Sequence, residues 1–231
     1  MSENVLEQLK GIKNQIEIKL SSKDKLVSFT PLTLKQQKDI LDNLSTSATT
    51  IITFFNNTTK IIQQNILEEV TLYVTDRPNI LISLRNNIDS NYNDIDLSKL
   101  IEKNKKVKSI DLNTTIETRD FTFNVKVPTL DKDIKVNEFL IKNYKDENAV
   151  IGKLYVNEVV KFIDTIIIKE TDTVINFNEL PVKKLFEITE NIESHNFKEI
   201  YEFIQLVRNH EKELVTLDDV QVDIGPELFV L

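Results

Sequence analysis

The order of apolar and polar residues changes several times along the chain and predicts a mixture of strands and helices. Apolar residues alternate with polar ones over 16–20 and return at 26–29, which is typical of strands. Pro31 then biases Thr30 away from helical angles, and Thr33 follows as a helix cap. The spacing after Thr33 predicts a helix over 33–44 with four residues on one side: Leu34, Gln37, Lys38 and Leu41.

The rest of the first half alternates between helical and extended patterns. Apolar residues at helical spacing predict a helix that begins at Ser47, and residues 71–74 are expected to be extended. Asp76 precedes Arg77 and Pro78, which is a favourable helix start because proline needs no hydrogen bond in the first turn. A polar loop over 86–94 and a short helix over 96–103 are expected next, and a helical turn is expected over 5–9.

A hairpin is the clearest feature in the middle of the chain. Residues 107–118 and 121–127 alternate apolar with polar positions, Arg119 and Asp120 lie between them, and Pro128 ends the pattern. Beyond it the spacing becomes mainly helical. Four helices are expected, around Phe139, around Val159 and ending near the isoleucine run 166–168, around Leu185, and over 197–207. A final strand is expected at 220–224.

These patterns together predict an α+β protein. We expect a small mixed β-sheet or hairpin with helices in the first half and a mainly helical second half. A break near Pro128 divides the chain into an α+β part over 1–128 and a mainly helical part over 129–231, or both parts form one continuous domain. No internal repeat and no sustained heptad pattern is visible.

Composition excludes several classes of function. The chain has 231 residues, a net charge of -8, no cysteine and three isolated glycines. Thiolate metal sites, disulfides and glycine-rich phosphate loops are therefore excluded, and an acidic protein is a poor ligand for nucleic acid. No apolar run approaches the ~20 residues that span a bilayer, and the N-terminus lacks a signal-peptide pattern. We expect a soluble protein made in the cytoplasm.

The titratable residues do not form a recognisable catalytic motif. His195 and His210 lie roughly 20 Å apart on one expected helix, so they should not share a metal. Asp76 either caps a helix or pairs with Arg85. The acids at 218, 219 and 223 lack the spacing of a calcium loop and are expected in a solvated turn. We therefore expect no catalytic, cofactor-binding or metal-binding residues and no cofactor.

The C-terminus ends in a hydrophobic segment. Leu228 and Phe229 are large apolar residues near a chain end, where disorder is otherwise normal. Exposing them forgoes roughly 1.5–3 kcal/mol for each side chain, so we expect both to be buried. The segment packs either on the protein's own core or on a partner, and the sequence leaves both open.

Four segments in a fixed order resemble one known family. They are SFTPLTLKQQKDIL at 28–41, TDRPNILISLR at 75–85, the hairpin IDLNTTIETRDFTFNVKVP at 110–128, and a C-terminal third that contains NFKEIYEFIQLVRNHEKEL and a terminal LF. They are similar to segments of the baseplate hub and hub-assembly proteins of T-even-like contractile-tail bacteriophages. The chain departs from that family by having Gln36 and Gln37 in place of acids, and by lacking cysteines near its C-terminus.

The resemblance implies a non-enzymatic structural or assembly component of the baseplate hub. The alternative is a transient assembly chaperone that is absent from the mature virion. Either protein is made in the host cytoplasm and contacts other tail and baseplate proteins, in several copies within a symmetric assembly, without binding nucleic acid or membrane. Exposure and apolarity suggest four residues for these contacts: Arg119, Phe121, Leu228 and Phe229.

Overall fold

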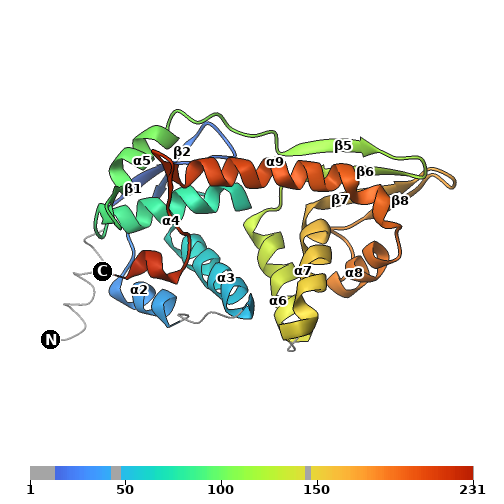
Figure 1. Cartoon of the computed structure of the whole chain (residues 1–231), viewed down its shortest axis with the longest axis horizontal. Helices are drawn as coiled ribbons and strands as arrows, with labels where there is room; N and C mark the ends of the chain where they lie inside the picture. The colour runs from blue at the N-terminus through green and yellow to red at the C-terminus, as the bar shows by residue number, and fades with distance from the viewer. Residues whose placement is uncertain (1–13, 43–47, 144–146, 231) are drawn as a thin grey trace.

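The computed structural model describes residues 14–42, 48–143 and 147–230, so the helical turn expected over 5–9 lies outside the described residues. The molecule is elongated, and one long helix runs along it between two regions (Figure 1). One region contains the first strands and helices together with the end of the chain, and the other contains the largest sheet. The fold is mixed α+β, as expected, but every strand pairing is antiparallel.

The first region begins with a hairpin and two helices. Its elements are β1 (Ile16–Lys19), β2 (Leu26–Phe29), α2 (Leu34–Leu41) and α3 (Ala48–Asn65). Thr33 caps α2 as predicted: Gln36 N donates to Thr33 Oγ1 at 3.2 Å, and Thr33 N donates to Gln36 Oε1 at 3.0 Å. The Asn65 amide fixes the preceding turn by donating to the carbonyl of Pro31 at 3.2 Å.

The side of α2 that packs inward overlaps only in part with the predicted side. Leu34 is 82% exposed, whereas Ile40 is buried. The C-terminal segment packs against α2, and Gln37 Nε2, on the predicted side, donates to the Phe229 carbonyl at 2.9 Å. Of the four residues predicted to share one side, Gln37 and Leu41 are partly buried, whereas Leu34 and Lys38 are exposed.

The same region continues through η1, α4 and a small hairpin to α5. The elements are η1 (Val74–Asp76), α4 (Arg77–Asn86), β3 (Asn91–Tyr92), β4 (Ile95–Asp96) and α5 (Leu97–Asn104). Pro78 lies in the first turn of α4, as predicted. Asp96 caps α5 by accepting a hydrogen bond from Ser98 N at 3.0 Å. The predicted helices after Asp76 and over 96–103 are therefore confirmed.

The main sheet has four antiparallel strands in the order β5-β6-β7-β8. The strands are β5 (Asn113–Glu117), β6 (Phe121–Lys126), β7 (Ile163–Ile168) and β8 (Thr173–Asn176). The hairpin β5–β6 is confirmed, but the isoleucine run of β7 was wrongly assigned to the end of a helix. β-Branched residues favour strands, and the run pairs with β6. The sheet thus takes two strands from each side of residue 128.

Helices cover one face of this sheet. They are α6 (Leu130–Asn143), α7 (Glu147–Phe162), α8 (Val182–Glu190), η2 (Ser194–Phe197) and α9 (Lys198–Leu214). On the covered face Phe123 is fully buried, with its ring centroid 5.9 Å from that of Phe197. On the other face Asn124 Nδ2 donates to Thr165 Oγ1 at 2.6 Å, which continues a polar row across the strands.

The chain returns to the first region after α9. It forms β9 (Thr216–Leu217), β10 (Val220–Gln221) and η3 (Pro226–Phe229), and η3 lies beside α2 (Figure 1). Asp218 and Asp219 have φ angles of 47° and 66° and form the turn of the small hairpin, as the solvated-turn interpretation required. The predicted strand over 220–224 is shorter than expected, since β10 ends at Gln221. Val222 N still donates to the Val215 carbonyl at 2.8 Å, and the Val222 side chain is fully buried.

Candidate functional site

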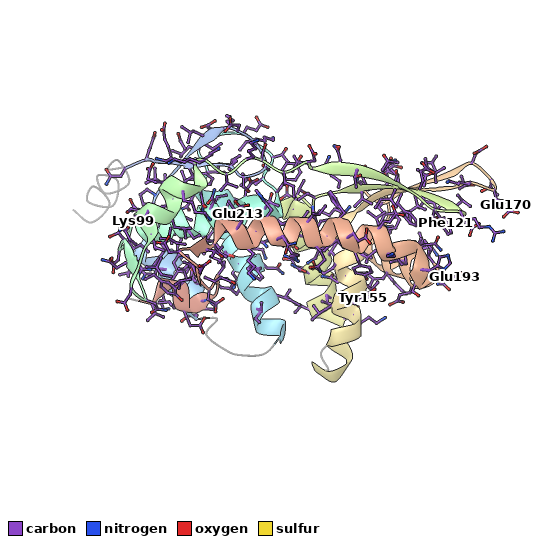
Figure 2. The ribbon with its side chains drawn as sticks, turned by 45° about the horizontal axis from the view of Figure 1, so that its top comes forward. Lys99, Phe121, Tyr155, Glu170, Glu193 and Glu213 are labelled. Carbon is purple, nitrogen blue, oxygen red and sulfur yellow. The ribbon has the colours of Figure 1, made fainter. Side chains whose placement is uncertain are left out.

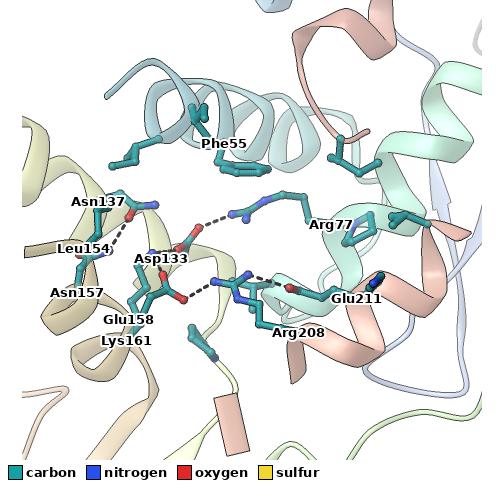
Figure 3. Close-up of a pocket in the computed structure, with 18 of the residues that line it drawn as sticks. Phe55, Arg77, Asp133, Asn137, Leu154, Asn157, Glu158, Lys161, Arg208 and Glu211 are labelled. Atoms are coloured by element: carbon teal, nitrogen blue, oxygen red, sulfur yellow. Dashed lines mark hydrogen bonds and ion pairs between the residues drawn. The ribbon is translucent and has the colours of Figure 1, made fainter. Parts of the chain in front are cut away.

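Six charged residues meet where the two regions join, and we call them the charge network. They come from four helices that are well separated in the sequence: one residue from α4, one from α6, two from α7 and two from α9 (Figure 3). Cations and anions alternate along the network, which is neutral as a whole. Its members in spatial order are Arg77, Asp133, Lys161, Glu158, Arg208 and Glu211.

Asp133 is the centre of the buried half of the network. Its carboxylate accepts hydrogen bonds from Arg77 Nη2 and lies 2.8 Å from Lys161 Nζ, so two cations share one anion. The side chains of Asp133 and Lys161 are only 5% and 8% exposed. Arg77 Nη2 also donates to Thr59 Oγ1 at 3.0 Å. The guanidinium carbon of Arg77 lies over the Phe55 ring, 4.9 Å from the ring centroid. The guanidinium is therefore fixed in position on several sides.

The other half of the network reaches the surface. Glu158 lies 3.1 Å from Lys161 Nζ and also accepts a hydrogen bond from Arg208. Arg208 in turn lies 2.8 Å from the carboxylate of Glu211. The side chain of Arg208 is 48% exposed, so water screens the ion pairs at this end more than those around Asp133.

The protonation of the network follows from the balance between burial and charge. Burial alone raises the pKa of a carboxyl, but at Asp133 the neighbouring Lys161 and Arg77 outweigh burial and hold its pKa well below the usual range. Burial lowers the pKa of Lys161, but Asp133 and Glu158 outweigh this effect and raise it. These groups are therefore charged at neutral pH.

Glu211 differs from the other two carboxyls of the network. Burial outweighs its pairing with Arg208, so the pKa of Glu211 is raised. At Glu158 the order is reversed: burial raises the pKa, but the cations Lys161 and Arg208 lower it further than burial raises it. The interior of the network is thus strongly ionised, whereas Glu211 at its end is ionised less strongly.

A cavity of about 420 Å³ lies beside the network. Its wall combines network members with apolar residues such as Phe55 and Val222. Two buried atoms in the wall, Arg77 Nε and Asn157 Oδ1, have no hydrogen-bond partner among the described residues. The volume is sufficient for several water molecules, which commonly satisfy such groups in protein interiors.

Sequence reasoning missed the charge network. Asp133 and Arg77 are 56 positions apart, and Arg208 and Glu158 are 50 apart, so spacing along the chain gave no indication that they meet. One local signal was available. Asp133 belongs to the buried side of α6, together with Leu130, Val136 and Leu140. A charge on the apolar side of a helix indicates a buried partner.

Asp76 neither pairs with Arg85 nor caps α4 through its side chain. The carboxylate is fully buried and accepts hydrogen bonds from Ser22 N and Ser22 Oγ at 2.8 Å each and from Tyr73 N at 2.9 Å. Burial raises its pKa, and these hydrogen bonds oppose the increase. Asp76 therefore ties the turn after β1 to the start of η1. Its capping role applies to that 3₁₀ turn and not to α4.

The two histidines have different environments. His195 is exposed, with Nδ1 3.2 Å from Glu193. His210 is partly buried, and burial lowers its pKa despite the nearby Glu213 and Asp76. Among the described residues, no group of three or more His, Cys, Asp or Glu side chains is arranged to hold a metal ion.

The structure separates the four contact candidates into two pairs. Arg119 and Phe121 lie at the free end of the main hairpin and line a shallow hollow there, and the Arg119 side chain is 93% exposed. Figure 2 shows Phe121 near this end of the molecule. Leu228 and Phe229 are fully buried in the protein's own core, so they are not available to a partner in this structure. Of the two destinations that the sequence left open for the tail, the chain adopts its own core.

Side-chain donors hold the tail in place. Arg85 Nε donates to the Leu228 carbonyl at 2.7 Å, and Gln37 Nε2 donates to the Phe229 carbonyl at 2.9 Å. The Arg85 guanidinium also donates to the Asn91 carbonyl at 3.0 Å. The sequence predicted burial of the tail but did not indicate that an arginine in α4 would bind it.

Comparisons with protein-family models, with curated proteins and with solved structures found no match to this chain. Within the described ranges, no helix combines the length and the apolar character that crossing a membrane requires.

Proposed function

We propose that this chain is a non-enzymatic structural or assembly component of the baseplate hub of a contractile bacteriophage tail. The observation that carries the proposal is the resemblance of four segments, in a fixed order, to baseplate hub and hub-assembly proteins. The four windows form an extended segment that turns into a capped helix, a helix between Asp76 and Arg85, a hairpin, and a long helix followed by a buried LF pair.

The nature of the buried polar groups also supports a structural role. The charge network joins α4 to α6, α7 and α9, and each member is an ion-pair partner of another member. Such a set of paired charges fixes the relative positions of helices, because moving one helix separates buried opposite charges. An elongated body whose helices are joined by ion pairs suits a protein that transmits position between neighbouring subunits.

The hairpin end is the contact surface that we favour for other tail proteins. Arg119 is highly exposed, and Phe121 is partly buried with its ring 5.6 Å from that of Phe123. Arginine and aromatic residues are enriched among the residues that dominate protein interfaces. The net charge of -8 favours protein partners over nucleic acid.

Loss of the protein in the phage that encodes it tests the proposal. A nonsense mutation in the gene should give lysates without infectious particles, with tails that lack complete baseplates by electron microscopy. Mass spectrometry of purified wild-type particles separates the two roles: a hub component is present in stoichiometric amounts, and a transient assembly chaperone is absent. Normal tails and normal infectivity in the mutant lysate would contradict both.

A surface substitution tests the contact region separately. Arg119→Glu changes a side chain that contributes little to folding, so purified protein should unfold as the wild type does while baseplate assembly falls. Lys108→Glu, at another exposed position, makes the same charge change away from the hairpin end and is the matched control. If both substitutions leave assembly intact, the hairpin end is not the contact surface.

A further inference from the structure

The outer face of α9 is open to solvent along its whole length. Figure 2 shows this helix in front of the rest of the molecule. Its inner face carries the buried residues Ile200, Phe203, Ile204, Val207 and Leu214. The outer face is a stripe at helical spacing, which we call the α9 stripe, and its residues are all exposed: Lys198, Glu202, Gln205, Leu206, Asn209 and Glu213.

The α9 stripe combines an apolar centre with opposite charges at its ends. Leu206 is 62% exposed, although burying such a side chain is favourable. Lys198 and Glu213 lie at equal distances from the midpoint between Gln205 and Leu206, and about 22 Å apart along the helix at 1.5 Å per residue. Neither Lys198 nor the Glu213 carboxylate has an ion-pair partner among the described residues.

We propose that a second copy of this chain docks on the α9 stripe, with the two α9 helices antiparallel about a two-fold axis near Gln205 and Leu206. A two-fold interface places residue i opposite residue j and residue j opposite residue i. In this arrangement Lys198 faces the partner's Glu213, and the same pair repeats on the other side of the axis. Leu206 packs at the centre beside the partner's Gln205.

Charge complementarity selects this occupant and this orientation. A parallel pairing would place Lys198 against the partner's Lys198 and Glu213 against the partner's Glu213, which is unfavourable. The antiparallel pairing makes every end contact attractive. The stripe is complementary to itself, which a surface for an unrelated protein has no need to be.

An aromatic pair forms one edge of the same surface. Tyr155 on α7 stacks on Tyr201 of α9, with ring centroids 4.4 Å apart, and Tyr155 is 55% exposed. These rings and the stripe residues Lys198, Gln205 and Leu206 line one shallow hollow. Tyrosines are enriched at protein interfaces because they combine a large apolar area with a polar end.

Cysteine cross-linking tests the geometry directly, because the chain has no cysteine of its own. Gln205→Cys places a thiol near the proposed axis, so mild oxidation should give a disulfide-linked dimer. Lys35→Cys, at an exposed position on α2, is the control and should remain monomeric under the same conditions. A Gln205→Cys protein that cross-links no faster than Lys35→Cys would overturn the proposal.

A mixture of two variants establishes whether the two α9 helices are antiparallel or parallel. Lys198→Cys and Glu213→Cys should each cross-link poorly alone and efficiently when mixed, because the antiparallel pairing places each residue opposite the other. Self-cross-linking of each variant, without cross-linking of the mixture, would indicate a parallel pair and contradict the proposed orientation.

Charge reversal tests the energetics by analytical ultracentrifugation of the purified full-length protein. Lys198→Glu and Glu213→Lys should each raise the dimer Kd about tenfold, and the double variant should recover most of the loss. Lys35→Glu makes the same charge change on α2 and should leave the Kd unchanged. A wild-type protein that stays monomeric at all concentrations would overturn the proposal, and this result does not depend on the proposed phage function.

Discussion

Two buried arginines on α4 have different partners at the two places where distant parts of the chain meet. Arg85 binds the tail through neutral backbone carbonyls, and its nearest carboxylate oxygen, on Asp89, is 3.8 Å away. Arg77 binds the fully ionised Asp133 within the charge network. The Arg85 contact is made mainly with backbone groups that do not titrate. The Arg77 contact depends on a carboxylate that must stay charged.

The difference shows that burial of a cation does not require a buried anion. At the tail, the fixed fork of the guanidinium matches several carbonyl oxygens, and the apolar side chains of Leu228 and Phe229 supply the burial around it. In the charge network, three cations and three anions compensate one another, so the loss of any one leaves a neighbour uncompensated. The tail contact should therefore respond to loss of apolar area, and the network to loss of charge.

Removal of the tail should have the largest effect. A chain truncated after Pro226 loses two fully buried side chains, at roughly 1.5–3 kcal/mol each, and leaves Arg85 Nε without its acceptor. We expect the free energy of unfolding to fall by about 3–6 kcal/mol in urea titrations. Truncation that leaves stability unchanged would show that the tail does not contribute to the core.

Substitution of the central anion should have a similar or slightly smaller effect. Asp133→Asn leaves Arg77 and Lys161 buried without their shared carboxylate, and breaking a buried pair costs about 3–5 kcal/mol. The control is Glu138→Gln on the same helix, which removes an exposed pair with Lys60 and should cost less than about 1 kcal/mol. Equal losses in the two variants would contradict the structural role of the charge network.

The face of α2 on which the tail packs can be tested by a matched pair of substitutions. Ile40→Ala removes a buried side chain and should cost about 2–5 kcal/mol. Leu34→Ala removes a side chain that is 82% exposed on the same helix and should change stability by less than about 0.5 kcal/mol. The reverse order would mean that Leu34, and not Ile40, faces the interior.

Acid should separate the charge network from the tail contact. The pKa of Asp133 is lowered in the folded protein, so its stabilising contribution is present above the unfolded pKa of about 3.9 and is lost as pH falls toward the folded value. Below about pH 4, this group should reduce the free energy of unfolding by about 1.4 kcal/mol per pH unit.

A comparison of variants isolates the contribution of Asp133 to the loss of stability in acid. Asp133→Asn should show a shallower decrease in stability with acid than the wild type, whereas the variant truncated after Pro226 should keep the wild-type slope. Thermal unfolding followed by circular dichroism between pH 5 and 3 measures both. Parallel curves for the wild type and Asp133→Asn would show that Asp133 does not have a lowered pKa in the folded state.

The sequence by itself determined the elements that depend on neighbouring residues. The cap at Thr33, the start of α4 at Pro78 and the hairpin around Arg119 were all predictable, because caps, proline and strand alternation act within a few residues. The expectation that Leu228 and Phe229 are buried also followed from their composition alone.

Tertiary structure decided everything that required a partner from elsewhere in the chain. The isoleucines of β7 suit a buried helix end or a strand, and pairing with β6 selected the strand. The tail packs against α2, and the meeting of four helices converted Asp133 from an ordinary helical acid into the centre of a buried network. These outcomes depend on contacts between residues tens of positions apart, and the energy of such a contact is set by burial and distance, which local sequence does not encode.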